Sequence, residues 1–101
     1  MIVRMCEARA VPGRLEELVG FVLERVWPAV SAADGFRGGE VYRADSDTDP
    51  RLVVLTRWRD EAALAAVAGP GWRDAAVLLP GEDRLHARPP HVWHFTQVPV
   101  R

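Results

Sequence analysis

The chain has 101 residues, all thirteen of its basic residues are arginine, and its formal net charge at pH 7 is −1. The lack of lysine excludes a Schiff-base nucleophile and the lysine of a phosphate-binding P-loop, and the lack of asparagine excludes a catalytic asparagine. The arginines are scattered along a nearly neutral chain and form no nucleic-acid-binding pattern. The length fits one domain over residues 1–101.

Cysteine usage and hydropathy narrow the class of protein further. Cys6 is the single cysteine, which excludes an internal disulfide and cysteine-rich zinc motifs. Arg4 interrupts the N-terminus before a signal-peptide core forms, and the longest apolar run, residues 62–69, is far shorter than the roughly 18 residues of a membrane span. We therefore expect a reduced, cytoplasmic protein with no metal site, no membrane partner and no nucleic-acid partner.

The first third of the chain predicts a strand followed by a helix. Residues 2–10 are rich in apolar and short side chains and end at a Val-Pro-Gly turn, which predicts a strand. Apolar residues then recur at helical spacing and predict an amphipathic helix of about 18–20 residues. That stripe consists of Leu15, Leu18, Val19, Val22 and Val26. Pro28 is expected to kink the helix or loosen its final turn, and Gly35 to end it in the left-handed conformation.

The remaining chain predicts three more strands and a second helix. Residues 38–45 and 51–58 form a predicted hairpin, and Asp60 is expected to cap a helix over 61–68. Residues 69–71 are expected to break that helix, and residues 72–79 to form another short helix. We expect a loop over residues 80–90 and the last strand over residues 91–98. The order β-α-β-β-α-β predicts an α+β, ferredoxin-like fold with an antiparallel sheet.

The strand over 51–58 is apolar on both of its faces. Leu52 and Val54 point to one side of the sheet, whereas Val53 and Leu55 point to the other. Two helices cover only one face of a four-stranded sheet, and the other face would expose a large apolar patch on a monomer. The pattern therefore predicts a homodimer in which two sheets pack face to face.

Acidic residues at alternate positions in 45–49 resemble the start of a calcium-binding loop. The sixth position of that loop is Pro50 where the motif needs glycine, and the twelfth is Thr56 where it needs glutamate. The match fails, so we interpret the segment as a polar hairpin turn.

The ordered set of motifs resembles the antibiotic biosynthesis monooxygenase (ABM) family of dimeric α+β barrels. The central part of the resemblance consists of Gly35, Phe36, Tyr42, Trp58, Asp60 and Ala62 or Ala63. The later part is similar to an uncharacterised branch of that family and consists of Ala68, Gly69, Trp72, Val92, His94 and Phe95.

The resemblance implies a pocket in each monomer, between the sheet and the helices. In the best-known members this pocket holds a polycyclic phenol, which molecular oxygen oxidises to a quinone without a cofactor. Those members use polar residues on the third strand and second helix, where this chain has Val54 and Leu64. A haem-degrading branch uses an asparagine, a histidine and a tryptophan. Trp58 keeps the tryptophan, but Cys6 and Val67 or Ala68 replace the other two, which argues against haem degradation.

His94 and Arg4 are the candidate catalytic residues. His94 lies in an apolar strand, where burial shifts a histidine pKa, and it is expected either to act as a base toward a substrate phenol or to be a structural histidine. Arg4 also lies in an apolar strand and needs a partner, either Glu40 or Glu7 in an ion pair or a substrate anion. His91 is expected on the face opposite His94. His86 is expected either to be a solvated loop histidine or to reach the mouth of the pocket from its loop.

Five further residues are candidates for contacts with the substrate. Trp58 and Trp72 are expected either to stack on an aromatic ring or to be core residues, and Tyr42 either to bond a substrate oxygen or to lie at an interface. Cys6, expected to be an inert thiol, and Val54 complete the set.

These residues lead to three hypotheses about function. The leading one is a cofactor-independent monooxygenase for a hydrophobic aromatic small molecule, with no bound cofactor. The alternatives are a non-catalytic small-molecule-binding or stress-response protein of the same fold, and a cofactor-free isomerase or cyclase, because one fold supports many activities.

Overall fold

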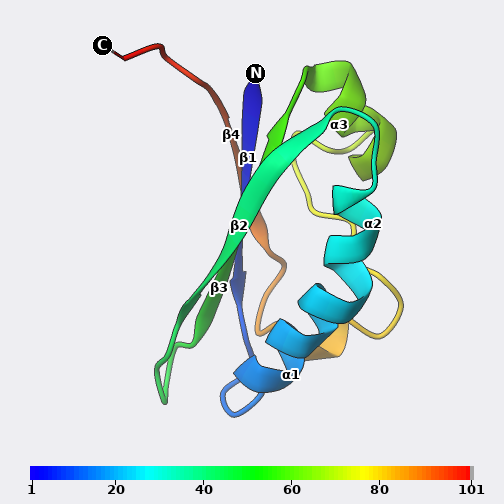
Figure 1. Ribbon diagram of the computed structural model, residues 1–101. Coiled ribbons are helices and arrows are strands. Elements are labelled where there is room, and N and C mark those ends of the chain that lie inside the picture. Colours follow the sequence, from blue (N-terminus) through cyan, green and yellow to red (C-terminus); the bar gives the residue numbers. More distant parts are fainter. Residues whose placement is uncertain (101) are drawn as a thin grey trace.

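The computed structural model describes residues 1–100 and shows a four-stranded antiparallel sheet with its helices on one face (Figure 1). The elements are β1 (Ile2–Arg9), α1 (Leu15–Phe21), η1 (Val22–Val26), α2 (Trp27–Ser31), β2 (Phe36–Ala44), β3 (Arg51–Trp58), α3 (Glu61–Ala68), η2 (Asp83–Leu85) and β4 (His91–Thr96). The predicted ferredoxin-like α+β order is therefore confirmed. No helix within residues 1–100 is long and apolar enough to cross a membrane.

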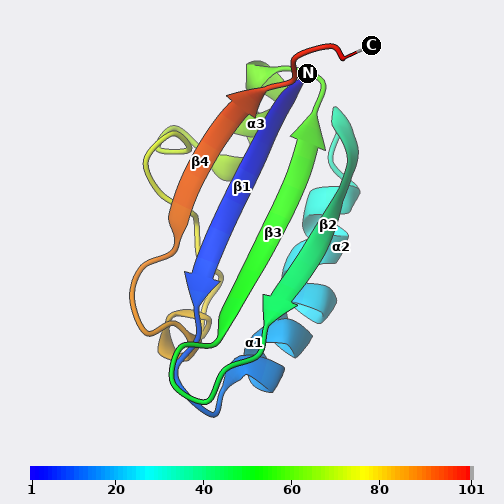
Figure 2. The same cartoon turned by 90° about the vertical axis from the view of Figure 1, so that its left-hand side faces the viewer.

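The sheet has the strand order β2-β3-β1-β4, with β1 and β3 in the centre (Figure 2). In this register Arg4 of β1 lies between Thr56 of β3 and His94 of β4, and Cys6 lies between Val54 and Val92. Because neighbouring residues in register point to the same face, these side chains all lie on the helix-covered face of the sheet. The register thus brings residues from both ends of the chain into one row.

The first helix is continuous from Leu15 to Ser31, but its middle, η1, is a π-helical turn. There the Trp27 amide bonds to the Val22 carbonyl, five residues earlier. Pro28 follows directly, and a proline ring clashes with the carbonyl of the preceding turn, which favours this wider spacing. The expected disturbance from Pro28 is thus present, but it lies in the turn before the proline and not in the last turn.

Gly35 lies beyond the end of α2 and does not cap it, contrary to the expectation. The helix ends at Ser31, and Gly35 has a φ of +88° in the turn that enters β2. A Cβ atom there would clash with the Ala63 Cβ, so glycine lets this turn approach α3. Asp60 caps α3 as predicted, since its Oδ1 accepts a hydrogen bond of 2.8 Å from the Ala63 amide.

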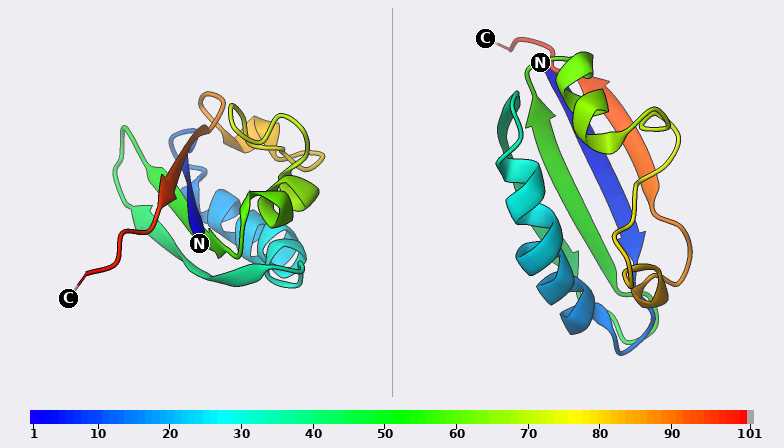
Figure 3. Two further views of the ribbon diagram at one scale, coloured as in Figure 1. Left: turned by 90° about the horizontal axis from the view of Figure 1, so that it is seen from above. Right: turned by 90° about the vertical axis from the view of Figure 1, so that its right-hand side faces the viewer.

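The predicted helix over residues 72–79 is wrong. Residues 70–74 form a turn, and residues 75–79 run without regular structure across the helix-covered face (Figure 3). The turn is held by the Trp72 amide on the Gly69 carbonyl and by the Asp74 and Ala75 amides on the Gly71 carbonyl. The carbonyls of Trp72 and Ala75 accept bonds from the Arg4 side chain, and this tertiary contact overrides the local helical pattern.

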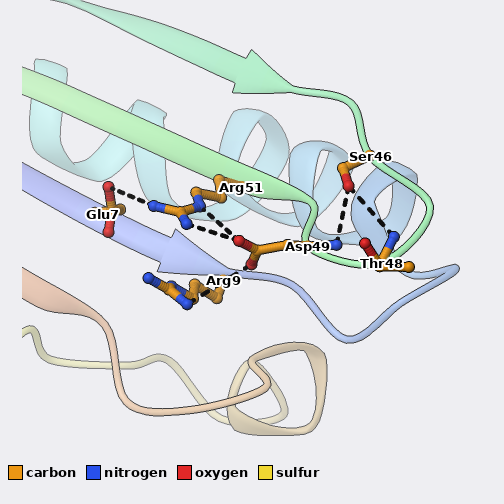
Figure 4. Close-up of polar contacts among 6 residues, drawn as sticks. All are labelled: Glu7, Arg9, Ser46, Thr48, Asp49 and Arg51. Carbon is orange, nitrogen blue, oxygen red and sulfur yellow. Dashed lines mark hydrogen bonds and ion pairs between the residues drawn. The ribbon is translucent and has the colours of Figure 1, made fainter.

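The hairpin between β2 and β3 is a polar turn, as predicted, and it is bound to β1 (Figure 4). The Ser46 hydroxyl accepts hydrogen bonds from the amides of Thr48 and Asp49. The Asp49 carboxylate pairs with Arg51 at 2.6 Å and with Arg9 of β1 at 3.8 Å. The Asp49 carboxylate is therefore engaged by arginines, which leaves this loop without a calcium-binding arrangement.

The core consists of two groups of buried side chains on the helix-covered face. One group is at the α1 end and comprises Ala8, Ala10, Leu15, Leu18, Val22, Leu52 and Leu85. The other is at the α3 end and comprises Ile2, Trp58, Ala63, Leu64, Ala68 and Trp72. Helix α1–α2 runs along one side of this face, and α3 with residues 69–90 runs along the other (Figure 3).

The opposite face of the sheet carries no helix (Figure 2). Strand alternation places Val53, Leu55 and Met5 there, together with the exposed aromatic residues Tyr42, Trp93 and Phe95. We call this the outer face. It is the apolar face that the sequence predicted for β3, and Leu52 lies on the inner side as expected.

Candidate functional site

A cavity of about 230 Å³ lies between the sheet and the helices. Its lining includes members of both core groups, such as Leu52 and Trp58, so the cavity separates these groups. Most of the lining side chains are aliphatic or aromatic. The side chains with a cationic, anionic, imidazole, thiol or hydroxyl group in the lining are those of Arg4, Glu82, His86, Cys6 and Thr56.

Arg4 lies at one end of this cavity and has no carboxylate partner among residues 1–100. Its Nη1 donates to the Trp72 carbonyl at 2.7 Å, and its Nη2 donates to the Ala75 carbonyl at 3.4 Å. The ion pair expected with Glu40 or Glu7 is wrong, because both carboxylates lie on the outer face and pair with Arg57 and Arg51. Burial lowers the Arg4 pKa, yet a guanidinium keeps its charge at neutral pH.

His94 is next to Arg4 but is not part of the cavity wall. Its Nε2 lies 2.9 Å from Arg4 Nη1, and because arginine only donates, Nε2 must accept this bond. The ring also packs edge-to-face on Trp72, with 4.7 Å between ring centroids. Burial, with the nearby charges of Arg4 and Arg73, lowers the pKa of His94. His94 is therefore a neutral acceptor that helps to orient Arg4.

Three of the predicted substrate-contact residues line the cavity: Trp58, Cys6 and Val54. Trp58 is fully buried and its Nε1 donates a 2.8 Å hydrogen bond to Thr56, which fixes the indole against the cavity. Burial raises the pKa of the Cys6 thiol to about 11, so this group stays protonated at neutral pH.

The two other predicted contact residues do not line the cavity. Trp72 is buried behind Arg4, where its backbone carbonyl and its ring hold Arg4 and His94. Tyr42 is 54% exposed on the outer face, because its strand position alternates with that of the inward-facing Val41. Its hydroxyl donates a 3.3 Å hydrogen bond to Glu40.

The other end of the cavity holds a buried pair of His86 with Glu82, and Glu82 is the member that the sequence interpretation missed. His86 Nε2 lies 2.8 Å from Glu82 Oε2, and the side chains are only 4% and 7% exposed. His86 was expected in a solvated loop or at the pocket mouth, and its backbone forms a β-bridge with Ala10 that fixes it beside β1, in the cavity wall. The four-residue spacing of Glu82 and His86 around Leu85 is the signal in the sequence that indicates a pair on one side of a helical turn.

The donor set of the cavity does not fit the haem-binding pattern. The α3 positions that would supply the histidine are Val67 and Ala68, and both line the cavity with hydrocarbon side chains. Cys6, at the position of the asparagine, is a protonated thiol. No cluster of three or more His, Cys, Asp or Glu side chains suited to a metal ion occurs within residues 1–100.

A model of the family described as antibiotic biosynthesis monooxygenase matches residues 1–77. No curated protein has a detectably similar sequence.

Several solved structures share the fold at low sequence identity. Rv0793 from Mycobacterium tuberculosis is 20% identical, with 98% of this chain and 96% of that chain covered and a TM-score of 0.73. The monooxygenase ActVA-Orf6 of Streptomyces coelicolor, in complex with nanaomycin D, is 18% identical and has a TM-score of 0.71. That match covers 99% of this chain and 89% of that chain. A MhuD variant with two manganese protoporphyrin IX molecules per active site is 19% identical and has a TM-score of 0.70. That match covers 100% of this chain and 98% of that chain.

Proposed function

Because the chain belongs to the antibiotic biosynthesis monooxygenase family, we propose that it oxidises a small hydroxylated aromatic compound with molecular oxygen. One observation carries the proposal: an apolar cavity contains, at one end, a guanidinium with no carboxylate partner within residues 1–100. An apolar wall suits an aromatic ring, and an unneutralised cation suits the negative charge that develops on the ring oxygen.

The cavity volume indicates the size of the substrate. Ligand pockets for drug-sized molecules measure roughly 300–1,000 Å³, whereas an apolar cavity of about 150 Å³ holds benzene. At about 230 Å³, this cavity fits one or two fused rings better than the polycyclic phenols implied by the family resemblance. We take 1-naphthol as the probe of this substrate class.

The proposed reaction needs no resident cofactor, since the deprotonated phenol is itself electron-rich. Loss of the hydroxyl proton gives a naphtholate, which donates electrons from the ring carbon opposite the oxygen to dioxygen. One oxygen atom becomes the new carbonyl and the other leaves as water, so 1-naphthol and O₂ give 1,4-naphthoquinone and H₂O. Arg4 binds the oxygen that carries the charge, His94 orients Arg4, and Trp58, Cys6 and Val54 contact the ring.

We also propose that the whole chain forms one domain and that two copies associate through the outer face. β4 completes the sheet although it lies beyond the family match, which supports a single domain. The exposed Trp93, Phe95 and Tyr42 support a partner on the outer face. Sedimentation velocity is expected to give a dimer for the native chain and a monomer for Phe95→Asp. A native chain that stays monomeric at micromolar concentration contradicts the association.

Oxygen consumption with 1-naphthol and a panel of hydroquinones tests the activity. Val54→Phe fills the cavity and is expected to abolish consumption, whereas Leu23→Phe, on the exposed side of the first helix, is expected to keep it. Product formed without oxygen would indicate an isomerase or cyclase instead. Binding of 1-naphthol without any turnover would indicate a binding protein.

A further inference from the structure

One side of the cavity has no regular secondary structure. The sheet forms the floor of the cavity, and the first helix and α3 each form a side. The remaining side includes residues 76–79, four consecutive residues that all line the cavity and belong to no helix or strand. We call residues 75–80 the strap, and its course over the helix-covered face is visible in Figure 3.

The mouth of the cavity borders on the strap. Three of the lining residues are exposed: Ala29 of α2, Val67 of α3, and Val77 of the strap, which is 67% exposed. The other lining side chains are buried or half-buried, so these three mark the place where the cavity meets solvent. Of the three elements at this mouth, α2 and α3 are held by their own helical hydrogen bonds, whereas the strap is not.

Few hydrogen bonds hold the strap in place. The backbone amides and carbonyls of residues 76–78 make no hydrogen bond to another backbone group within residues 1–100. Side chains hold the two ends of the strap. Arg4 Nη2 donates to the Ala75 carbonyl at 3.4 Å, and the Leu79 amide donates to Glu82 Oε1 at 3.2 Å. A segment with so few bonds and an exposed centre belongs to the low-stability part of a fold.

The segments on both sides of the strap are fixed. Before it, Trp72 is 6% exposed in the core group at the α3 end, and its carbonyl accepts a 2.7 Å bond from Arg4. After it, Glu82 lies 2.8 Å from His86, and both side chains are almost fully buried. Gly81, between the strap and Glu82, has a φ of +86°, which glycine adopts more readily than any other residue. The strap therefore has fixed anchors and a glycine at which the backbone turns.

We propose that the strap is the gate of the cavity: it swings away from the sheet about Gly81 to admit an aromatic ligand, and then closes again. This inference rests on the proposed function for the class of ligand. Opening separates the Ala75 carbonyl from Arg4 and the Leu79 amide from Glu82. Closure restores both bonds, and because one of them is made to Arg4, the closed gate also holds the cation at its place in the cavity.

Hydrogen exchange of the ligand-free native chain tests whether the strap opens by itself. The Leu79 amide is the reporter, because its hydrogen bond within residues 1–100 is to Glu82. Its exchange is expected to be almost independent of low urea concentrations, as for a local opening. The amides that join β1 to β3 are expected to exchange faster as urea is added. If the Leu79 amide shows the protection and the urea dependence of β1 and β3, the strap opens only when the whole chain unfolds, and the proposal is overturned.

Gly81→Ala tests where the gate turns. A Cβ atom at Gly81 meets no atom within 4 Å, so alanine adds strain to the left-handed backbone without a clash. Opening relieves this strain, and the Leu79 amide is expected to exchange about fivefold faster or more.

Gly13→Ala is the matched control for this substitution. Gly13 has a φ of +84° and equally open surroundings, but it lies in the turn before α1 and does not line the cavity. Gly13→Ala is expected to leave the exchange of the Leu79 amide unchanged. An equal acceleration in both variants, or none in Gly81→Ala, overturns the proposal.

Binding kinetics of 1-naphthol under argon test the passage of a ligand. Trp58 lines the cavity, so stopped-flow tryptophan fluorescence follows entry and exit. In Gly81→Ala both rate constants are expected to rise about fivefold while the Kd changes less than about twofold, because the strain is the same in the free and the bound closed states. Gly13→Ala is expected to keep both rate constants. An unchanged entry rate constant in Gly81→Ala would mean that the strap is a fixed wall, which overturns the gate.

These measurements separate the gate from the proposed function, because none of them requires turnover. If the native chain shows gated binding but consumes no oxygen, the gate stands and the monooxygenase proposal fails. If oxygen is consumed while Gly81→Ala keeps the native exchange and binding rates, the gate is wrong and the activity stands. If 1-naphthol binds to neither chain, or if Gly81→Ala does not fold, the exchange of the Leu79 amide in the native chain decides whether the strap opens.

Discussion

Two histidines lie near the cavity, His94 beside Arg4 and His86 in the cavity wall, and they differ in the charged group that each contacts. At the strand end, His94 gives its acceptor nitrogen to Arg4, which leaves a cation facing the cavity. At the loop end, His86 Nε2 lies 2.8 Å from Glu82 Oε2, and both side chains are almost fully buried. The same residue type thus accepts a hydrogen bond from a cation in one place and pairs with a carboxylate in the other.

The largest expected effect concerns the packing of the loop end. Leu85 is 1% exposed, and Leu85→Ala is expected to lower the free energy of unfolding by about 3 kcal/mol, because it removes buried contacts and leaves a void. Urea unfolding measures the change. Leu23→Ala, at a 49% exposed position, is the control and is expected to cost less than about 0.5 kcal/mol. An equal, small cost for both variants would mean that the loop end is not a packed part of the fold.

The next effect concerns the strand end. Arg4→Met keeps most of the side-chain volume but leaves the Trp72 carbonyl without its donor, so a loss of about 2 kcal/mol is expected. Hydrogen exchange of residues 72–75 is expected to become faster at the same time. Arg73→Met removes only an exposed pair with Glu61 and is expected to change stability by less than about 0.5 kcal/mol. Comparable losses for both variants would contradict the special role of Arg4.

A smaller effect is the pH dependence that His94 contributes. Its pKa is lower in the folded chain than its ordinary value of 6.5, so the unfolded chain binds a proton in a pH range where the folded chain does not. The contribution of His94 to the free energy of unfolding is therefore fully present above that range and is lost as the pH decreases through 6.5. The loss is less than about 1 kcal/mol because the side chain is partly exposed. Urea unfolding at pH 7.5 and 5.5 is expected to show a larger loss for the native chain than for His94→Gln. An equal loss in the two chains would show that His94 does not contribute to the pH dependence of stability.

The smallest effect uses Cys6 as a probe between the two ends. Arg4 lowers and Glu82 raises the pKa of its thiol, in addition to the larger effect of burial. Iodoacetamide reacts with the thiolate, and the thiolate fraction changes tenfold for each unit of pKa. Alkylation at pH 8 is therefore expected to be about threefold slower in Arg4→Met and about threefold faster in Glu82→Gln. All variants are expected to react equally in urea. Faster reaction in both folded variants would indicate opening of the fold instead of an electrostatic effect.

The sequence predicts the frame of the cavity well, because that frame depends on local rules. Turn residues separate the elements, and strand alternation places Arg4, Cys6 and Val54 on one face, as the structure shows. The same alternation, applied to Tyr42, would have placed it on the outer face. Tyr42 pairs with Val53 in the register of β2 and β3 and therefore shares the outer face with it, whereas the interpretation of Tyr42 as a substrate contact relied on the family resemblance.

The loop end was not predictable in the same way, because its burial depends on contacts far apart in the sequence. His86 is surrounded by proline and charged residues, which is typical of a solvated loop. Its β-bridge with Ala10 joins positions that no local pattern relates. Likewise, residues 72–79 include alanines and leucines that favour a helix, but the hydrogen bonds from Arg4 to the carbonyls of Trp72 and Ala75 accompany a non-helical segment.

The π-helical turn over Val22–Val26 has a consequence for how the length of the chain can change. The turn contains one residue more than a regular helix would, and Val22 and Val26 within it line the cavity. Deleting a single residue there would give a more regular helix, but it would rotate α1 by about 100° about its axis relative to α2. Leu15 and Leu18 would then turn away from the sheet. The segment is therefore fixed in residue count as well as in composition, and insertions or deletions are tolerated better in the exposed hairpin around residues 45–48.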